Sequence, residues 1–228
     1  ISPSMNTRPN ASSSKRSSAA CPLSTAVARC PSSSSNPTAT SRLIVDCGFN
    51  KGVVASRLLQ KLPEFSLVGF EVQQDIQGCA DNVKKRFPGR KIDVIYAAVG
   101  DKDGAVAYYE PSKWGKNYKG GTTTVADKRS MSVNYEQPKT APSIDFSRWL
   151  AENVSDAHFV FVKMDIEGGE YGVIEHLLAT GAIDRIDVLA VEWHADKFPE
   201  PTRTKYLDIE KRIRRYADDN RITVMDWY

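Results

Sequence analysis

The sequence predicts an α/β fold with a doubly wound, mostly parallel sheet. Short apolar runs alternate with amphipathic segments from residue 43 to residue 226, the first run ends in a glycine-containing turn, and acidic residues stand where strands would end. Strands that alternate with crossover helices form parallel sheets with right-handed connections. With 228 residues, 41% of them hydrophobic, the chain is long enough for one globular domain.

The apolar runs predict the strands. Each run is short and rich in aliphatic or aromatic residues, as expected of strands buried on both faces. We expect strands at residues 43–47, 67–71, 92–99, 159–165 and 186–193, and extended segments at 105–110 and 222–226.

Helical periodicity between these runs predicts the helices. We expect them at residues 53–61, 75–87, 169–180 and 203–219. Pro88-Gly89 would end the second helix, and Gly181 would cap the third. The last helix carries an apolar stripe at helical spacing, formed by Tyr206, Ile209, Ile213 and Tyr216.

Two segments lack such patterns. Residues 1–42 contain 13 serines and five basic residues but no acid, so they cannot bury enough apolar area to offset their loss of conformational entropy. We expect a disordered, Ser-rich basic tail, either a transit peptide or a plain flexible extension, before a folded domain at 43–228. Residues 111–142 predict a long loop, either a lid over a ligand or a solvated insertion.

Charge and composition limit the partners. The net charge of the chain is +3, but residues 43–228 carry 26 basic against 28 acidic residues, a balance of −2 that gives no basis for nucleic-acid binding. No apolar run reaches the roughly eighteen residues of a membrane span. The four cysteines lack metal-ligand spacing. We expect a soluble intracellular protein without disulfides, located in an organelle if the tail is a transit peptide.

The turn after the first strand predicts a nucleoside site. Asp46 ends the strand, and Gly48 and Gly52 follow four residues apart. A dinucleotide site would need a further glycine at the position of Asn50, where the backbone must approach a pyrophosphate. An adenosyl ligand without phosphates, S-adenosylmethionine, fits better. Glu71 ends the second strand, where a carboxylate can accept hydrogen bonds from ribose hydroxyls; alternatively, these acids cap the following helices.

Several motifs resemble the FkbM-like methyltransferases. Val45-Asp46-Cys47-Gly48-Phe49-Asn50-Lys51-Gly52 is similar to that family's Asp-x-Gly-x-Asn-x-Gly, and the stretch from Phe159 to Glu170, with Lys163, Asp165 and Glu167-Gly168, is similar to its strand-four motif. Gly69-Phe70-Glu71, Ala97–Gly104 and Ser143-Ile144-Asp145 also resemble family segments.

The resemblance implies a Rossmann-like methyltransferase fold and S-adenosylmethionine as cofactor. It implies that Ala97 and Ala98 lie near the adenine, beside the donor loop of Asp46, Gly48, Asn50 and Gly52 and the ribose-binding Glu71. Because the sequence ends at Tyr228, just after the sixth expected strand, we expect the final antiparallel hairpin strand of such methyltransferases to be missing, or the chain to be a fragment.

Asp165 and His194 are the candidate catalytic residues. Both follow predicted strands at one rim of the sheet, where either could take a proton from an acceptor hydroxyl. Glu170 and Glu192 are further acids there, and a neutral His194 with a pKa near ~6.5 would suit a base; alternatively, it is an ordinary hydrogen-bonded histidine. The acids from Asp165 to Glu170 could bind magnesium, but a helix turn explains them equally, and we assign no metal ligand.

We therefore expect an S-adenosylmethionine-dependent methyltransferase that acts on an oxygen of a small molecule or sugar. A second hypothesis is a catalytically degenerate member that binds the nucleoside as an interaction module. A nicotinamide oxidoreductase is a third, and Asn50 counts against it. The sequence does not identify the acceptor.

Overall fold

The computed structural model describes residues 41–112, 120–129, 133–156 and 158–227, which belong to one compact unit. The predicted tail lies outside the described residues, apart from Ser41 and Arg42, which begin the first strand. Of the long predicted loop, only part is described. The cysteines within the described part, Cys47 and Cys79, are unpaired. No helix in this part is long and apolar enough to cross a membrane.

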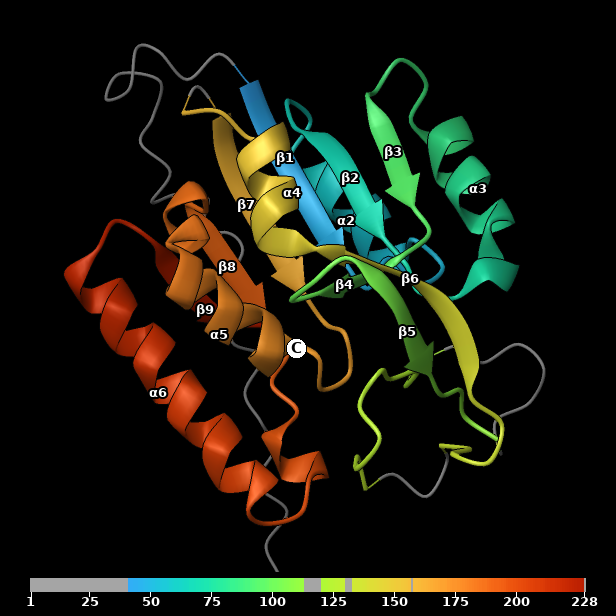
Figure 1. The fold of residues 1–228 in the computed structure, drawn as a ribbon. Coiled ribbons are helices and arrows are strands. Elements are labelled where there is room, and N and C mark those ends of the chain that lie inside the picture. Colours follow the sequence, from blue (N-terminus) through green and yellow to red (C-terminus); the bar gives the residue numbers. More distant parts are fainter. Residues whose placement is uncertain (1–40, 113–119, 130–132, 157, 228) are drawn as a thin grey trace, which may run out of the picture. The chain divides into compact units, whose positions relative to one another are not determined.

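A six-stranded parallel sheet forms the centre of the fold (Figure 1). Its order is β3-β2-β1-β7-β8-β9, and each pair of neighbours is parallel. The strands are β1 (Ser41–Cys47), β2 (Ser66–Phe70), β3 (Ile92–Ile95), β7 (His158–Met164), β8 (Val188–Val191) and β9 (Thr223–Asp226). The chain order reverses between β1 and β7, which is where ligands bind in open α/β sheets.

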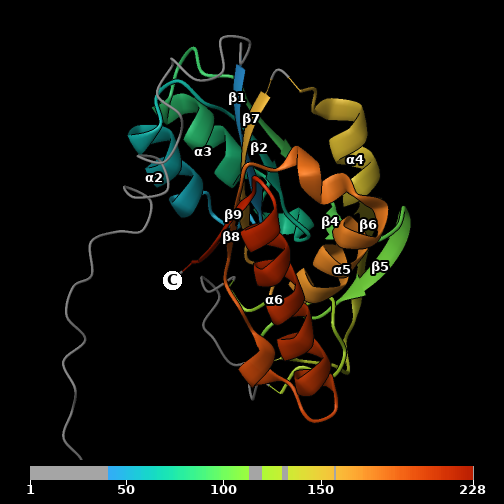
Figure 2. The ribbon, with the colours of Figure 1, turned by 90° about the vertical axis from the view of Figure 1, so that its left-hand side faces the viewer.

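Helices cover both faces of this sheet. They are α2 (Val53–Lys61), α3 (Gly78–Arg86), α4 (Phe146–Asn153), α5 (Glu170–Thr180) and α6 (Thr202–Asp219), with short 3₁₀ turns η1 (Gln74–Ile76), η2 (Ala182–Arg185) and η3 (Ala195–Lys197). Figure 2 shows α2 and α3 on one side of the sheet and α4 and α5 on the other. The α/β prediction, with its doubly wound parallel sheet, is confirmed. The large sheet contains no antiparallel pair among the described residues.

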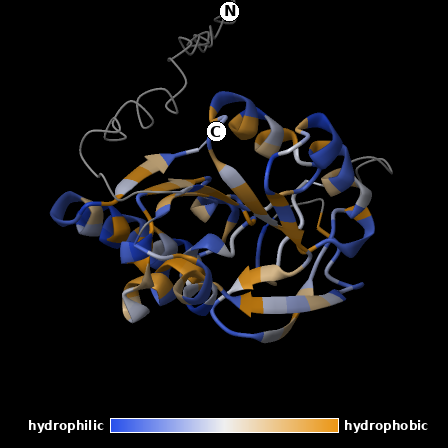
Figure 3. Ribbon diagram, turned by 90° about the horizontal axis from the view of Figure 1, so that it is seen from above, coloured by the Kyte–Doolittle hydropathy of each residue, from blue (hydrophilic) through white to orange (hydrophobic). Residues whose placement is uncertain are grey.

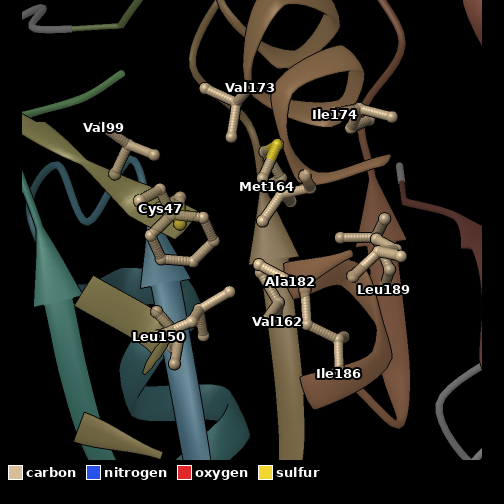
Figure 4. Packing of buried hydrophobic residues seen from close by; sticks show 14 of the residues in the cluster. Cys47, Val99, Leu150, Val162, Met164, Val173, Ile174, Ala182, Ile186 and Leu189 are labelled. Carbon is tan, nitrogen blue, oxygen red and sulfur yellow. The ribbon is translucent and has the colours of Figure 1, made fainter. Parts of the chain in front are cut away.

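The core lies between the sheet and the helices α4 and α5. Cys47 of β1 and Val162 and Met164 of β7 face Leu150 of α4 and Ile174 of α5, and all five side chains are buried (Figure 4). The central strands are mostly hydrophobic, whereas the helices also carry hydrophilic stretches (Figure 3). This pattern follows from strands that are covered on both faces and helices covered on one.

A second, three-stranded sheet corrects two predictions. Its order is β4-β6-β5, from β4 (Ala98–Gly100), β6 (Lys139–Asp145) and β5 (Gly104–Tyr108). The single strand expected at 92–99 is wrong, because the chain turns after Ile95 and passes from the large sheet to the small one. Residues 139–142, expected in the loop, are the first part of β6, which pairs antiparallel with β5 and parallel with β4.

Gly52 holds the start of α2 in a conformation that disfavours other residues. Its φ is +70°, and a Cβ there would lie 2.5 Å from Val83 Cγ2 and 2.7 Å from Phe49 Cζ. We predict that Gly52→Ala lowers the free energy of unfolding by about 1–3 kcal/mol, through backbone strain and overpacking.

Gly172→Ala is the matched control for this prediction. Gly172 lies inside α5, and a Cβ at this position would meet nothing within 4 Å. Alanine favours the helix there, so we expect a gain of about 0.5–1 kcal/mol. Urea unfolding of the two variants measures both changes. Equal stability of the two variants would contradict the assigned role of Gly52.

Candidate functional site

A cavity lies at the carboxyl ends of β1, β2 and β7. It comprises about 690 Å³ of empty space, part of which is open to solvent. Its lining residues are Gly48, Asn50, Phe70, Glu71, Val72, Gln73, Ala97, Ala98, Val99, Gly120, Gly121, Thr122, Thr124, Asp165, Ile166 and Glu167.

The turn after β1 is tightly packed against the turn after β7. The φ of Gly48 is +88°, and a Cβ on this residue would lie 1.9 Å from the carbonyl oxygen of Asp165. The Gly48 amide donates to Phe70 O at 3.0 Å, and the Asp165 amide donates to Cys47 O at 3.0 Å. Only glycine fits at position 48, because the backbone of Asp165 occupies the space that a side chain would need.

Two residues other than glycine have positive φ in the described part of the chain, and both line the cavity. Asn50 has a φ of +49° and Glu167 a φ of +59°. Asparagine tolerates this region, but glutamate rarely adopts it, and such strain is concentrated at functional sites. Gly52, by contrast, does not line the cavity; it is the residue that precedes α2.

Glu71 links the turn after β1 to the end of β2. Its Oε2 accepts the Asn50 amide at 2.6 Å and its Oε1 accepts the Gln73 amide at 2.8 Å. Burial raises the pKa of the Glu71 carboxyl, against the lowering effect of the two hydrogen bonds. Each carboxylate oxygen retains a lone pair for a ligand in the cavity, because a carboxylate offers about four acceptor sites.

Asp46 does not line the cavity and is fully buried below it. Its Oδ1 lies 3.2 Å from Lys163 Nζ, a charge contact without an aligned hydrogen bond. Lys163 is also buried; it donates to Gly48 O at 3.0 Å and lies 3.4 Å from Asp165 Oδ2. Burial favours the neutral amine, but Asp46 and Asp165 outweigh it and raise the pKa of Lys163. Sequence reasoning gave Lys163 no role, although a lysine within the apolar run before Asp165 was a signal.

Asp165 and Glu167 reach the cavity from the turn after β7. Burial raises the pKa of Asp165, and nearby Lys163 opposes this effect. The pKa of Glu167 is lowered instead: burial favours its neutral form, but Lys128 and His194 stabilise its carboxylate. Two acids on one turn therefore have opposite tendencies to hold a proton.

His194 lies behind this turn and does not line the cavity. Its side chain has no exposed surface, its Nδ1 lies 3.0 Å from Glu170 Oε1, and its amide donates to the Tyr171 hydroxyl at 2.9 Å. Burial favours the neutral imidazole, but the surrounding glutamates outweigh it and raise the pKa of His194 to about 10. The sequence-based hypothesis required a neutral histidine near the acceptor, and the structure places a buried histidine among acids.

A segment of the long loop forms one wall of the cavity. Gly120, Gly121, Thr122 and Thr124 line it, and Thr123 Oγ1 donates to Glu167 O at 2.8 Å. Lys128 is buried and forms an ion pair with Glu167. These contacts favour a ligand-facing role for residues 120–128 over a solvated insertion, and the composition of this segment alone contained no sign of them.

The cavity is acidic and partly apolar. Its lining includes three carboxylates, Glu71, Asp165 and Glu167, and no lysine, arginine or histidine among the described residues. Ala97 and Ala98 add small apolar surfaces next to Glu71. Such a lining favours a cationic or neutral ligand over one that carries phosphates, because like charges repel and phosphate sites are formed by basic groups or helix N-termini.

The ion pair below the cavity generates a stability prediction. Lys163→Met would leave Asp46 buried without its counter-charge, and we expect a loss of about 3–5 kcal/mol of unfolding free energy. Lys163→Met combined with Asp46→Asn removes both charges and should lose less than the single variant. Arg42→Met, which removes an exposed pair with Glu64, should cost about 1 kcal/mol or less. Urea unfolding measures all three; a double variant no more stable than Lys163→Met would contradict the pairing.

Comparisons with known proteins agree with the motifs. The model of the methyltransferase FkbM domain matches residues 46–219. No curated protein matches the chain. Among solved structures, the chain is similar to the yeast methylglyoxal/isovaleraldehyde reductase Gre2 in complex with NADPH, with a TM-score of 0.41 and 10% identity over 81% of this chain and 54% of the reductase.

The chain thus spans about half the length of that reductase, and a likeness at this TM-score carries no conclusion about ligand or activity. The domain match is different, because it covers most of the described fold and includes every residue that lines the cavity. The chain therefore belongs to the FkbM methyltransferase family.

Proposed function

We propose that the protein is an S-adenosylmethionine-dependent methyltransferase that acts on an oxygen of a small molecule or sugar. The observation that carries this proposal is the cavity itself: three carboxylates and no basic side chain line it among the described residues, at the strand ends where the family match lies. S-adenosylmethionine carries a sulfonium, an ammonium and a carboxylate group and no phosphate, so its net charge is positive and complements such a lining. When bound, it would supply an electrophilic methyl group.

The proposed donor site is one part of the cavity. The turn that follows β1 bounds it on one side, and strand β4 bounds it on the other. Glu71 would accept hydrogen bonds from the ribose hydroxyls, with Gly48 and Asn50 along the same ligand. Ala97 and Ala98 would flank the adenine, where small side chains leave room for a flat ring. Asp46 and Gly52 would act from below, by holding the turn in place.

Asp165 is the proposed general base. It lies on the cavity surface with 26% of its side chain exposed, and burial raises its pKa toward the range in which a carboxylate can take a proton from a hydroxyl. His194, the competing candidate, would act as a positioning residue, because its ring contacts Glu170 and lies outside the cavity.

An alternative from another class is a binding module that holds the nucleoside without turnover. The contacts of Glu71 and the cavity would serve binding equally well in that case. The two functions differ in the fate of the donor: an enzyme releases S-adenosylhomocysteine in the presence of a hydroxylated acceptor, whereas a binding module does not. A nicotinamide oxidoreductase is disfavoured, because the acidic lining would repel a pyrophosphate.

The first functional prediction concerns the donor. The chain should bind S-adenosylmethionine and not NAD, as measured by calorimetry. Glu71→Ala should weaken donor binding by about 1.5–3 kcal/mol, the range for hydrogen bonds to a charged group. Glu71→Gln, which keeps the shape of the side chain, should weaken it less.

Glu64→Ala is the matched control, since Glu64 is an acid near the other end of β2, paired with Arg42 at the surface. It should bind the donor as the unmodified chain does. Undiminished donor affinity in a folded Glu71→Ala variant would remove Glu71 from the site.

The second functional prediction concerns the base. Asp165→Asn preserves size but cannot take a proton, so we expect turnover to fall by about a hundredfold or more while donor affinity is retained. Mass spectrometry of S-adenosylhomocysteine release over a panel of hydroxylated acceptors measures this. Asp93→Asn, at an exposed position of β3, should be as active as the unmodified chain. Normal turnover in Asp165→Asn would exclude this carboxylate as the base.

A further inference from the structure

A second hollow adjoins the cavity at the turn after β1. It comprises about 700 Å³ of empty space, part of which is open to solvent. The residues that line both hollows are Gly48, Asn50, Gly120 and Asp165. The rest of its lining includes the first two residues of α2. The two hollows therefore meet at the turn, and the second, here called the α2 hollow, continues towards this helix.

One part of the lining of the α2 hollow is apolar. Phe49, Val53 and Val54 contribute to it; Phe49 is buried, Val54 is half-buried and Val53 is 56% exposed. Within the described part of the chain, the other large hydrophobic side chain that is exposed is Leu207, with 38%. A single exposed apolar side chain is ordinary on a protein surface. Val53 differs from that case because it shares a hollow with two further apolar residues.

The backbone fixes Val53 at this place. The Gly52 amide donates to Phe49 O at 2.9 Å, and the Ser56 amide donates to Gly52 O at 2.9 Å, so the turn runs directly into the helix. The first turn of α2 contains no acid, and the described residues provide no side-chain cap for it. Acids and small polar residues are favoured at such a position, because they interact with the free amides. Two valines there suit a surface that contacts a ligand better than a solvated helix end.

The charged groups of the α2 hollow largely balance one another. Lys163 and Asp165 both line it, and Lys163 Nζ lies 3.4 Å from Asp165 Oδ2. Lys51 is a further charged residue of the lining, and it is exposed, so water weakens its field. The α2 hollow therefore suits a neutral ligand, whereas the three carboxylates of the cavity favour a cationic one.

We propose that the α2 hollow binds the acceptor, and that the acceptor is a neutral hydroxylated compound with an apolar body. Val53 and Val54 would contact this body, and the hydroxyl would face Asp165, which the cavity and the α2 hollow share. Small-molecule sites commonly combine apolar surface with a few polar groups that fix the orientation of the ligand. The role of the hollow as the acceptor site rests on the proposed function, whereas its binding of such a compound does not.

This assignment narrows the class of acceptor. A free sugar presents hydroxyl groups on most of its surface and would bury little apolar area against Val53 and Val54, so it would gain little from them. An aromatic or aliphatic alcohol would cover both side chains. Val53 does not line the cavity, so it would select among acceptors without contacting the donor.

Binding of 2-naphthol to the full chain tests the site. This probe has a flat apolar body and a single hydroxyl, and its own fluorescence reports binding in the absence of a methyl donor. We expect Val53→Asp to weaken binding by about tenfold, because the contact with one valine side chain is lost. Val53→Leu keeps the surface apolar and should bind the probe at least as well as the unmodified chain.

The two aspartate variants are matched. Aspartate is favoured in the first turn of a helix, so Val53→Asp should remain folded. Leu207→Asp introduces the same charge at an exposed apolar position of another helix, α6. It should bind 2-naphthol as the unmodified chain does.

Several results would overturn the proposal. These are absence of 2-naphthol binding, or equal binding by the unmodified chain and folded Val53→Asp. Displacement of the probe by S-adenosylhomocysteine would place it in the donor part of the cavity instead. A dimer in size-exclusion chromatography that Val53→Asp dissociates would show that a second copy of the chain covers Val53.

Failure of the proposed function is distinguishable from failure of this site, because calorimetry measures donor affinity separately. A chain that binds 2-naphthol through Val53 but does not bind S-adenosylmethionine would refute the proposed function. It would leave the binding of neutral, apolar hydroxylated compounds in place.

Discussion

The ammonium group of Lys163 is the contact on which the geometry of the cavity depends. It lies within the buried strand β7, next to Asp46 of the neighbouring strand β1, and it donates to the carbonyl of Gly48. In a low-dielectric interior, such charges couple strongly, and each requires the other. The pair therefore holds the ends of β1 and β7 in the register in which Gly48 fits against the backbone of Asp165.

The acids at the cavity above this ion pair differ in their pKa values. Asp165 and Glu71 have raised pKa values because they are buried, whereas Lys128 and His194 lower the pKa of Glu167. Environments that push the pKa values of neighbouring acids apart allow one to exchange protons while another stays charged. In the proposed function, Asp165 exchanges the proton and Glu167 stays ionised.

The regular part of the fold was predictable from the sequence. The strands of the large sheet and most helices follow from patterns within a few residues, and Gly181, expected as a cap, adopts a φ of +74° at the end of α5. The strand β6 was not predicted, because Pro142 within it lacks an amide donor and argues against a strand. Helix α4 was also missed, although Asp145 caps it by accepting the Arg148 amide at 3.1 Å.

The candidate site was predictable only where its residues follow strands. Glu71 and Asp165 line the cavity, as expected from their place after strands at one edge of the sheet. Ala97 and Ala98, which the family resemblance had placed near the adenine, also line it. Contacts between distant segments left no local pattern: nothing near Lys128 indicates that it pairs with Glu167, 39 residues later. The pKa of His194 is raised by two such distant residues, Glu167 and Glu170, as well as by the nearby Glu192, and for this reason its unperturbed pKa was a poor guide.

The wall formed by residues 120–128 has a consequence for how this protein could diversify. It belongs to the connection between β5 and β6 of the small sheet, whereas the opposite side of the cavity is made by the strand ends of the large sheet. Surface connections tolerate insertion and substitution far better than buried strands. Descendants of this chain could therefore exchange one side of the cavity and keep the other, and so change the ligands that the cavity accepts without rebuilding the sheet.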